Sequence, residues 1–290
     1  MPAPDRVYIT ILQWPGRMDI DARVEALAAA AGIDPRPGRR MAEQEAPLIV
    51  DALNATGAKA AIKALRSAGI AAIGYTHRRV DELLPPFEAR RLVRAEGSLA
   101  AMYMCEPLRP RRDEPRGLLA GNITLIVRAR LAMFEVESTT ETVYDGGPSL
   151  ELAMPRLESA KHTTKSRVSD VIDVYEASGR AIRINGDKFH FDVLGEQMGV
   201  SDNSNADRLA MLLAEQAPRA HIDLHFEHNA FDSRGARLHA IRPRMGSDDT
   251  TVSKRDDAPA FDFYSAWLAL AHRTLLSPHG RAAGAADAQA

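Results

Sequence analysis

The residues with the clearest capacity for chemistry lie together in the run His221-Ile-Asp-Leu-His-Phe-Glu-His228. Side chains alternate between the two faces of a β-strand, so this run predicts one apolar face and one face of imidazoles and carboxylates. Such groups are ligands of Zn²⁺, Fe²⁺ and Mn²⁺ in proteins. The candidate metal ligands on the polar face are His221, Asp223, His225 and Glu227. If this strand neighbours residues 189–193, His190 and Asp192 could join the same face.

Simple alternation also predicts a half-buried strand that turns its polar face to solvent. Residues two apart on a strand lie ~6.5–7 Å apart, so a single ion could be held by only some of these side chains. The chain contains no glycine-rich nucleotide-binding motif, no Walker loop, no His-Glu-x-x-His zinc motif and no nucleophile elbow. We therefore expect a solvent-facing strand and predict neither catalytic residues nor a cofactor. A metal-dependent enzyme that uses residues 221–228 is the alternative function.

The composition is that of an ordinary globular protein. Of the 290 residues, 45% are hydrophobic and 26% are charged, and the formal net charge is −2. This charge gives no general attraction to nucleic acid or to anionic membranes. No apolar run approaches ~18 residues, which predicts no membrane span, and the start of the chain lacks a signal-peptide core, so we expect a cytoplasmic protein. The single cysteine, Cys105, excludes an internal disulfide and is expected to be a buried structural thiol.

Residues 1–76 predict a small α/β domain. Its strands are rich in β-branched and apolar residues, and its helices have N-cap and glycine stop signals such as Asp19 and Gly32. The expected elements are a strand at 7–12, a helix at 19–32, a short helix within 35–44, a strand at 47–53, a helix at 57–69 and a strand at 70–73. This βααβαβ order predicts a three-stranded sheet with helices packed on one side.

This region resembles the C-terminal domain of the bacterial ribosomal stalk protein L7/L12, a fold shared with the ClpS adaptor. The resemblance rests on the proline-led strand Pro47-Leu-Ile-Val50, on the helical stretch from Ala60 to Leu65, and on Ala68-Gly69 before the last strand. It implies a docking module for other proteins. One solvated face of the helix over 57–69 carries the residues that we predict to bind a partner, namely Lys59, Lys63 and Arg66.

Residues 77–116 predict a Pro- and Arg-rich bridge between two domains. Its nine arginines are interleaved with seven acidic residues, which favours a solvated connector over a nucleic-acid-binding patch. Residues 88–94 are expected to form a short helix within this bridge.

Residues 117–240 predict a β-rich second domain. Alternating patterns indicate strands at 122–127, 171–175, 181–184 and 189–193, with a hairpin turn at Asn185-Gly186. A helix over 206–216 should follow, with Asn205 as its N-cap. A series of hairpins followed by one amphipathic helix is similar to the pleckstrin-homology (PH) or GRAM-like fold, a bent β-sandwich closed at one end by its final helix.

The end of the chain predicts a linker over 241–259, a C-terminal helix over 260–278 and a disordered tail over 279–290. The helix is apolar on one side and should pack on its own chain, and Trp267 is a fourth partner-binding candidate. The sequence thus predicts an α+β protein with an L7/L12-like α/β unit and a PH-like unit. We expect a non-catalytic protein-interaction or adaptor protein that has a protein partner and does not bind nucleic acid.

Overall fold

The fold was analysed in a computed structural model that describes residues 6–83, 85–95, 101–110, 112–144, 155–224, 226 and 248–277. The N-terminal layer is a three-stranded antiparallel sheet with strand order β2-β1-β3 and three helices. Its elements are β1 (Val7–Gln13), α1 (Ile20–Ala31), α2 (Pro35–Ala42), β2 (Leu48–Leu53), α3 (Ala55–Ser67) and β3 (Ala71–Thr76). The predicted βααβαβ order of this region is confirmed.

Local capping signals define the helices of the N-terminal layer. Asp19 accepts a hydrogen bond from the Ala22 N–H at 2.8 Å and so begins α1, and Gly32 ends this helix with a φ of 66°. Asn54 caps α3 in the same way through the Gly57 N–H, and Gly69, with a φ of 79°, turns the chain into β3. Because these signals act within a few residues, the sequence alone located both helices.

The described residues that follow build one larger, eight-stranded sheet. Its strands are β4 (Phe87–Arg94), β5 (Met102–Pro107), β6 (Arg116–Leu119), β7 (Ile123–Tyr144), β8 (Pro155–Glu176), β9 (Ala181–Asn185), β10 (His221–Asp223) and β11 (Asp248–Asp256). Its helices are α4 (His77–Asp81), α5 (Asp202–Gln216) and α6 (Ala258–Leu276). The strand order is β10-β7-β8-β9-β4-β5-β6, and β11 also pairs with β7. The whole is an α+β protein, as the sequence predicted.

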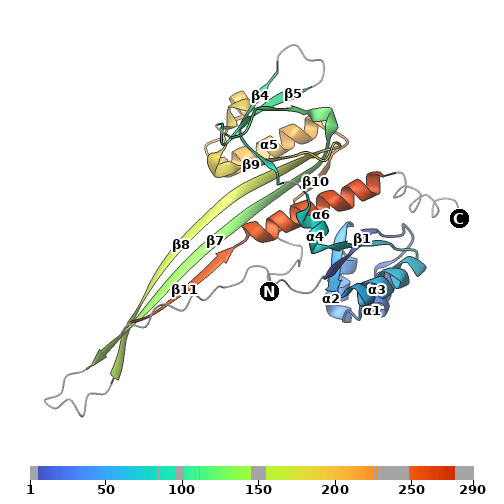
Figure 1. Cartoon of the computed structure of the whole chain (residues 1–290), viewed down its shortest axis with the longest axis horizontal. Coiled ribbons are helices and arrows are strands. Elements are labelled where there is room, and N and C mark those ends of the chain that lie inside the picture. Colours follow the sequence, from blue (N-terminus) through green and yellow to red (C-terminus); the bar gives the residue numbers. More distant parts are fainter. Residues whose placement is uncertain are drawn as a thin grey trace.

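Helix α6 lies between the two sheets and is buried on both sides (Figure 1). One side of the helix packs on β7 and β8. Successive residues of these two strands point alternately to α6 on one face of the sheet and to α5 on the other. The other side contacts Leu12 and Tyr75 of the N-terminal sheet. The outer face of that sheet packs on α1 and α3 in a separate hydrophobic cluster. The helix predicted near the C-terminus is therefore the layer that joins the two sheets.

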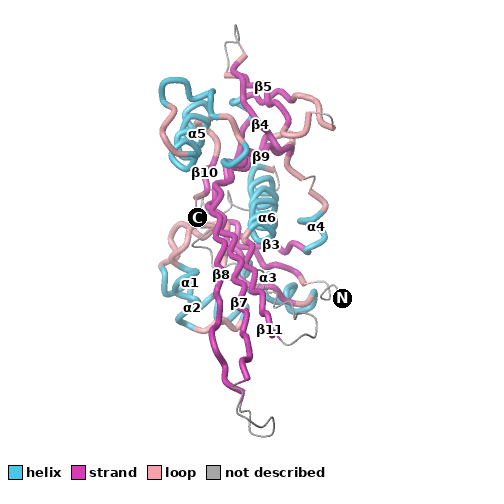
Figure 2. Tube along the Cα trace, turned by 90° about the vertical axis from the view of Figure 1, so that its left-hand side faces the viewer, coloured by secondary structure: helices cyan, strands magenta, loops and turns pink. Residues whose placement is uncertain are grey.

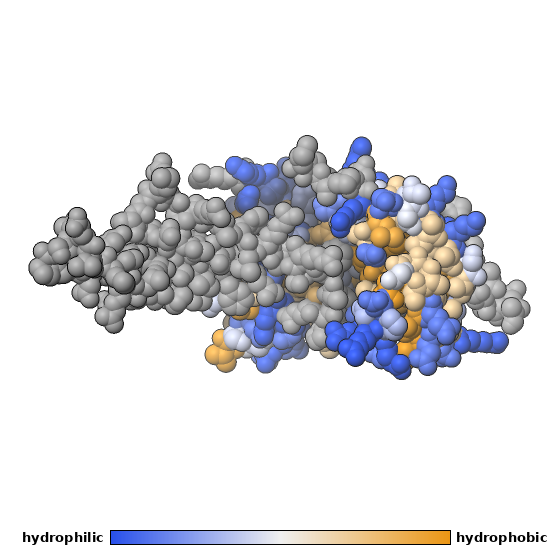
Figure 3. Space-filling model, turned by 90° about the horizontal axis from the view of Figure 1, so that it is seen from below, coloured by the Kyte–Doolittle hydropathy of each residue, from blue (hydrophilic) through white to orange (hydrophobic). Residues whose placement is uncertain are grey.

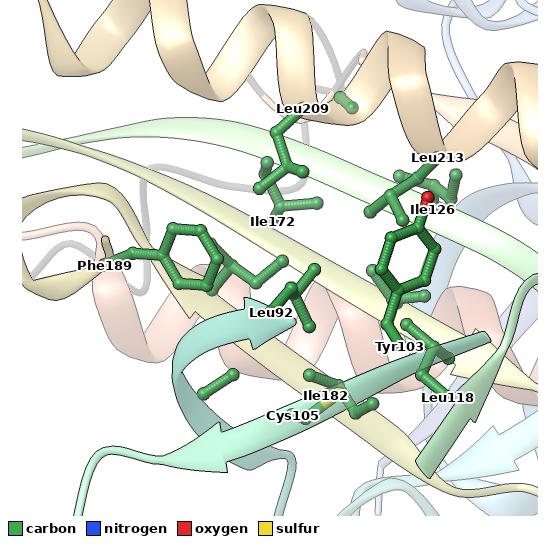
Figure 4. Packing of buried hydrophobic residues seen from close by; sticks show 14 of the residues in the cluster. Leu92, Tyr103, Cys105, Leu118, Ile126, Ile172, Ile182, Phe189, Leu209 and Leu213 are labelled. Atoms are coloured by element: carbon green, nitrogen blue, oxygen red, sulfur yellow. The ribbon is translucent and has the colours of Figure 1, made fainter. Parts of the chain in front are cut away.

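Helix α5 covers the opposite face of the large sheet (Figure 4). Leu209 and Leu213 of this helix point into a cluster that contains Ile126, Ile172 and Cys105. Cys105 is fully buried, as predicted, and burial raises the pKa of its thiol to about 12. This cysteine is part of the core.

Strands β7 and β8 are each 22 residues long and continue, together with β11, beyond the helices as an arm (Figures 1 and 2). The pairing of β11 with β7 corrects the prediction of a linker over 241–259 at residues 248–256, and residues 241–247 lie outside the described residues. The prediction of a short helix at 88–94 is also wrong, because β4 occupies this stretch between β9 and β5. The bridge expected over 77–116 therefore supplies strands of the large sheet.

Two further details differ from the prediction. No hairpin forms at Asn185-Gly186, because 3₁₀ turns follow β9 and His190 makes only an isolated bridge to Arg91. Ser201, rather than Asn205, caps α5, and the Asn205 side chain is buried and accepts a hydrogen bond from the Gly199 N–H. Among the described residues, no helix is long and apolar enough to cross a membrane.

Candidate functional site: a basic groove along α3

An open groove of about 730 Å³ runs along α3 on the N-terminal layer. Its two sides are one flank of α3 and the ends of β1 and β3 next to it. The lining residues are Val7, Ala55, Ala58, Lys59, Ile62, Lys63, Arg66, Ser67, Gly74 and Thr76. No acidic residue is among them. Three of the four predicted partner-binding residues therefore lie in one groove.

The groove has an apolar floor and a basic wall. Val7, Ala58 and Ile62 supply apolar surface, and Lys59 and Lys63 extend from consecutive turns of α3. Both lysines are exposed, and neither forms an ion pair with a described residue. Viewed from below, hydrophobic and hydrophilic side chains intermingle over the N-terminal layer, at the right of Figure 3. An apolar floor beside unpaired cations suits an occupant that is both apolar and acidic.

The local sequence explains the shape of the groove. Gly74 has no side chain, and a Cβ at this position would lie 2.6 Å from Val7 Cγ1 and 3.0 Å from Ile62 Cδ1. The glycine thus allows α3 to pack close to β3. Arg66 reaches from α3 to the strand and donates from Nε to the carbonyl oxygen of Ala72 at 2.9 Å. Arg66 consequently closes one end of the groove, whereas Lys59 and Lys63 remain available.

The polar face predicted for the strand at 221–228, which carries the candidate metal ligands, does not turn to solvent. Strand β10 has three residues, and Asp223 on it is only 6% exposed, while Ile222 and Leu224 are 36% and 51% exposed. The polar side chain turns inward because α6 covers this face of the sheet and the Tyr264 hydroxyl donates to Asp223 at 3.0 Å. His225 and Glu227 lie outside the described residues.

His190 and Asp192 do not join His221 and Asp223. Asp192 forms an ion pair with Arg91 of β4 at 3.1 Å, and β7, β8 and β9 separate β4 from β10. The prediction placed these residues together on the assumption that 189–193 forms a neighbouring strand, which it does not. Within the part of the chain that the structure describes, no group of three or more His, Cys, Asp or Glu residues could hold a metal ion.

Trp267 is not available to a partner. Its side chain is 1% exposed, and its indole N–H donates to the Thr10 hydroxyl at 2.8 Å across the contact between α6 and β1. The expectation that this helix packs on its own chain is confirmed, and Trp267 is corrected from a partner-binding candidate to a core residue.

A buried polar network that the sequence analysis missed joins α6 to the large sheet. Arg183 of β9 makes two hydrogen bonds of 2.7 Å to Asp173 of β8, which is fully buried. Ser265 of α6 donates to the same carboxylate at 2.7 Å, so its 2.9 Å contact with Tyr175 is donated by the tyrosine. Burial alone would lower the pKa of Arg183, but hydrogen bonds and the charges of Asp173 and Asp262 raise it. The guanidinium of Arg183 is therefore held between the carboxylates of Asp173 and Asp262.

A small cavity at the C-terminal end of α6 is lined by two further ionisable side chains, Glu176 and His272. Glu176 Oε1 and His272 Nε2 are buried without a hydrogen-bond partner, and both side chains line this cavity. It offers about 10 Å³ to the centre of a water molecule, which is room for about one water. Burial lowers the pKa of His272 to about 4, and His221, whose ring centroid lies 4.5 Å away, adds to this effect. The cavity as described has no space for an organic substrate.

No protein-family model, no curated protein and no solved structure matches this chain. The resemblances to the L7/L12 C-terminal domain and to the PH or GRAM-like fold therefore stay hypotheses. The contacts of the chain itself are the basis for interpreting its function.

Proposed function

We propose that this chain is a non-catalytic protein-interaction or adaptor protein of the cytoplasm, and that the groove along α3 docks its protein partner. The proposal rests on one observation: a single open groove with an apolar floor is lined by Lys59, Lys63 and Arg66. Apolar contact supplies affinity in such an interface, and charges at its rim select the partner and accelerate association.

A macromolecular partner suits the groove better than a small substrate. Sites for small molecules enclose most of the ligand and direct several polar groups at it. Here the polar side chains of Lys59 and Lys63 stand along one open wall. The net charge of the chain is −2, so the three cations of the groove are a small, local basic patch. Nucleic-acid binding depends on many contacts to phosphates, so this patch favours an acidic protein segment over nucleic acid.

The alternative of a metal-dependent enzyme receives less support. Asp223 already accepts a hydrogen bond from Tyr264, and His221 packs against His272. The Glu176–His272 cavity has room for about one water, so no organic substrate fits beside these two ionisable side chains.

The test is affinity capture from native lysate with three forms of the full-length chain. The groove variant carries Lys59→Glu and Lys63→Glu, and it leaves Arg66 intact because this residue bonds to Ala72. The control variant carries Arg36→Glu and Arg40→Glu, two exposed basic residues with the same spacing on α2. We expect a recurrent, stoichiometric partner that the control retains and the groove variant loses. A partner bound equally by all three forms, or no recurrent partner, would contradict the proposal.

A further inference from the structure

Strand β3 is an edge of the N-terminal sheet. The order β2-β1-β3 gives β3 one strand neighbour, β1, among the described residues. Residues along β3 are partly exposed, including Gly74 and Thr76, which also line the groove. An edge strand presents backbone N–H and C=O groups that can pair with another chain.

Helix α3 packs on the sheet next to this edge, with Ile62 against Gly74 and Arg66 bonded to Ala72. Lys59, Ile62, Lys63 and Arg66 line the groove from α3, and Gly74 and Thr76 line it from β3. Arg66 marks the boundary, because its guanidinium already bonds to the carbonyl oxygen of Ala72 in β3. The groove therefore has one wall of helix side chains and one side formed by Val7 of β1 and by Gly74 and Thr76 of the edge strand β3.

An extended peptide satisfies both sides at once. Its backbone can pair with β3, and every second side chain then lies on the face of the sheet that α3 covers. On that face, acidic side chains would meet Lys59 and Lys63, while the apolar side chains between them lie on the opposite face. A basic peptide would place like charges opposite one another, which is unfavourable.

We propose that the partner contributes an acidic, extended segment that adds to β3 as a fourth strand beneath α3. This inference rests on the proposed function, because it specifies how the same groove holds its partner. The backbone pairing gives affinity, and the lysines select acidic sequences.

The test titrates short synthetic peptides into the ¹⁵N-labelled full-length chain and follows backbone amide signals and their hydrogen exchange. The acidic probe alternates Glu with Val, and the charge control alternates Lys with Val. Two further acidic probes carry backbone N-methyl groups, one on every Glu and the other on every Val. In a strand, the N–H groups of alternate residues point to the same edge, and the peptide would pair with β3 through one edge only. One N-methylated probe therefore loses the N–H groups that bond to β3, and the other keeps them.

We expect the acidic probe to bind and to protect β3 amides from exchange. The Lys probe should bind the unsubstituted chain about tenfold or more weakly than the acidic probe does. The acidic probe should bind the Lys59→Glu/Lys63→Glu variant more weakly by a similar factor. One N-methylated probe should lose binding by a similar factor while the other retains it. Equal binding of both N-methylated probes, signal changes on α3 without protection of β3, or no preference for the acidic probe would overturn strand addition.

The outcomes separate this inference from the proposed function. If the acidic probe does not bind, but lysate capture is lost in the groove variant and kept in the Arg36→Glu/Arg40→Glu control, strand addition is wrong and partner docking stands. If lysate capture does not respond to the groove variant, the proposed function itself fails.

Discussion

Two regions of this molecule use charged residues in opposite ways. Between the large sheet and α6, the fully buried Asp173 and the partly buried Arg183 form an ion pair with two hydrogen bonds of 2.7 Å. In the groove, Lys59 and Lys63 are exposed, alike in charge and without an ion pair to a described residue. A buried charge must find a partner within its own chain, because leaving it unpaired costs several kcal/mol. An exposed charge carries no such cost and is free to select a partner in another molecule.

The buried network should show the largest effect on stability. Asp173→Asn removes the charge that Arg183 needs, so we expect the free energy of unfolding to decrease by about 3–5 kcal/mol in urea denaturation. Asp262→Asn is the matched control, because Asp262 contacts the same arginine from a side chain that is 55% exposed. Its loss should cost about 1 kcal/mol or less. Similar effects of the two substitutions would contradict the difference drawn between buried and exposed pairs.

The contact between α6 and the N-terminal sheet should come next. Trp267→Phe removes the indole N–H and leaves the buried Thr10 hydroxyl without its donor, so we expect a loss of about 1–3 kcal/mol. Thr10→Val removes the acceptor, and a double-mutant cycle with the two substitutions should give a coupling of about 1 kcal/mol. Strict additivity would show that this bond does not hold the two layers together.

The stability of the protein should depend on pH through His272. Burial holds the pKa of His272 at about 4 in the folded chain, while an unfolded histidine titrates near ~6.5. As the pH decreases through this window the unfolded state binds the proton first, so the free energy of unfolding decreases toward pH 4. His272→Gln should remove this part of the dependence, whereas His190→Gln, at an exposed position, should retain it. An unchanged pH profile in His272→Gln would contradict the assignment.

The groove lysines should show the smallest effect on stability. Since Lys59 and Lys63 make no ion pair with the described residues, Lys59→Glu/Lys63→Glu should change the free energy of unfolding by about 0.5 kcal/mol or less. The melting temperature of this variant should accordingly match that of Arg36→Glu/Arg40→Glu. A large loss of stability would mean that the basic wall is part of the structure rather than a docking surface.

The sequence predicted those parts of the fold that local signals determine. In the N-terminal layer, Asp19, Gly32 and Gly69 act within a few residues of the helix ends that they define. The large sheet depends instead on pairing between distant segments. Strand β4 lies beside β9 although about ninety residues separate them in sequence, and no local pattern reports such a neighbour.

The same distinction explains the errors at the candidate sites. Period-two alternation identified the two faces of the strand that contains Asp223, but it could not tell which face α6 would cover. The pairing of Asp173 with Arg183 could have been found, because strands were predicted at 171–175 and 181–184 and the two residues lie opposite each other when these strands pair. The basic side of α3 was visible in the helical period, and only its apposition to β3 required the structure.

The most direct test of the central claim is site-specific photo-crosslinking in native lysate. A photoreactive amino acid replaces Ser67, which lines the groove, or Ala29, an exposed position on α1 that does not. The proposed docking predicts an adduct from position 67 that maps to an acidic segment of one partner and disappears when Lys59→Glu and Lys63→Glu are added. Equal adducts from both positions, or an adduct at position 67 that survives the charge reversal, would contradict it.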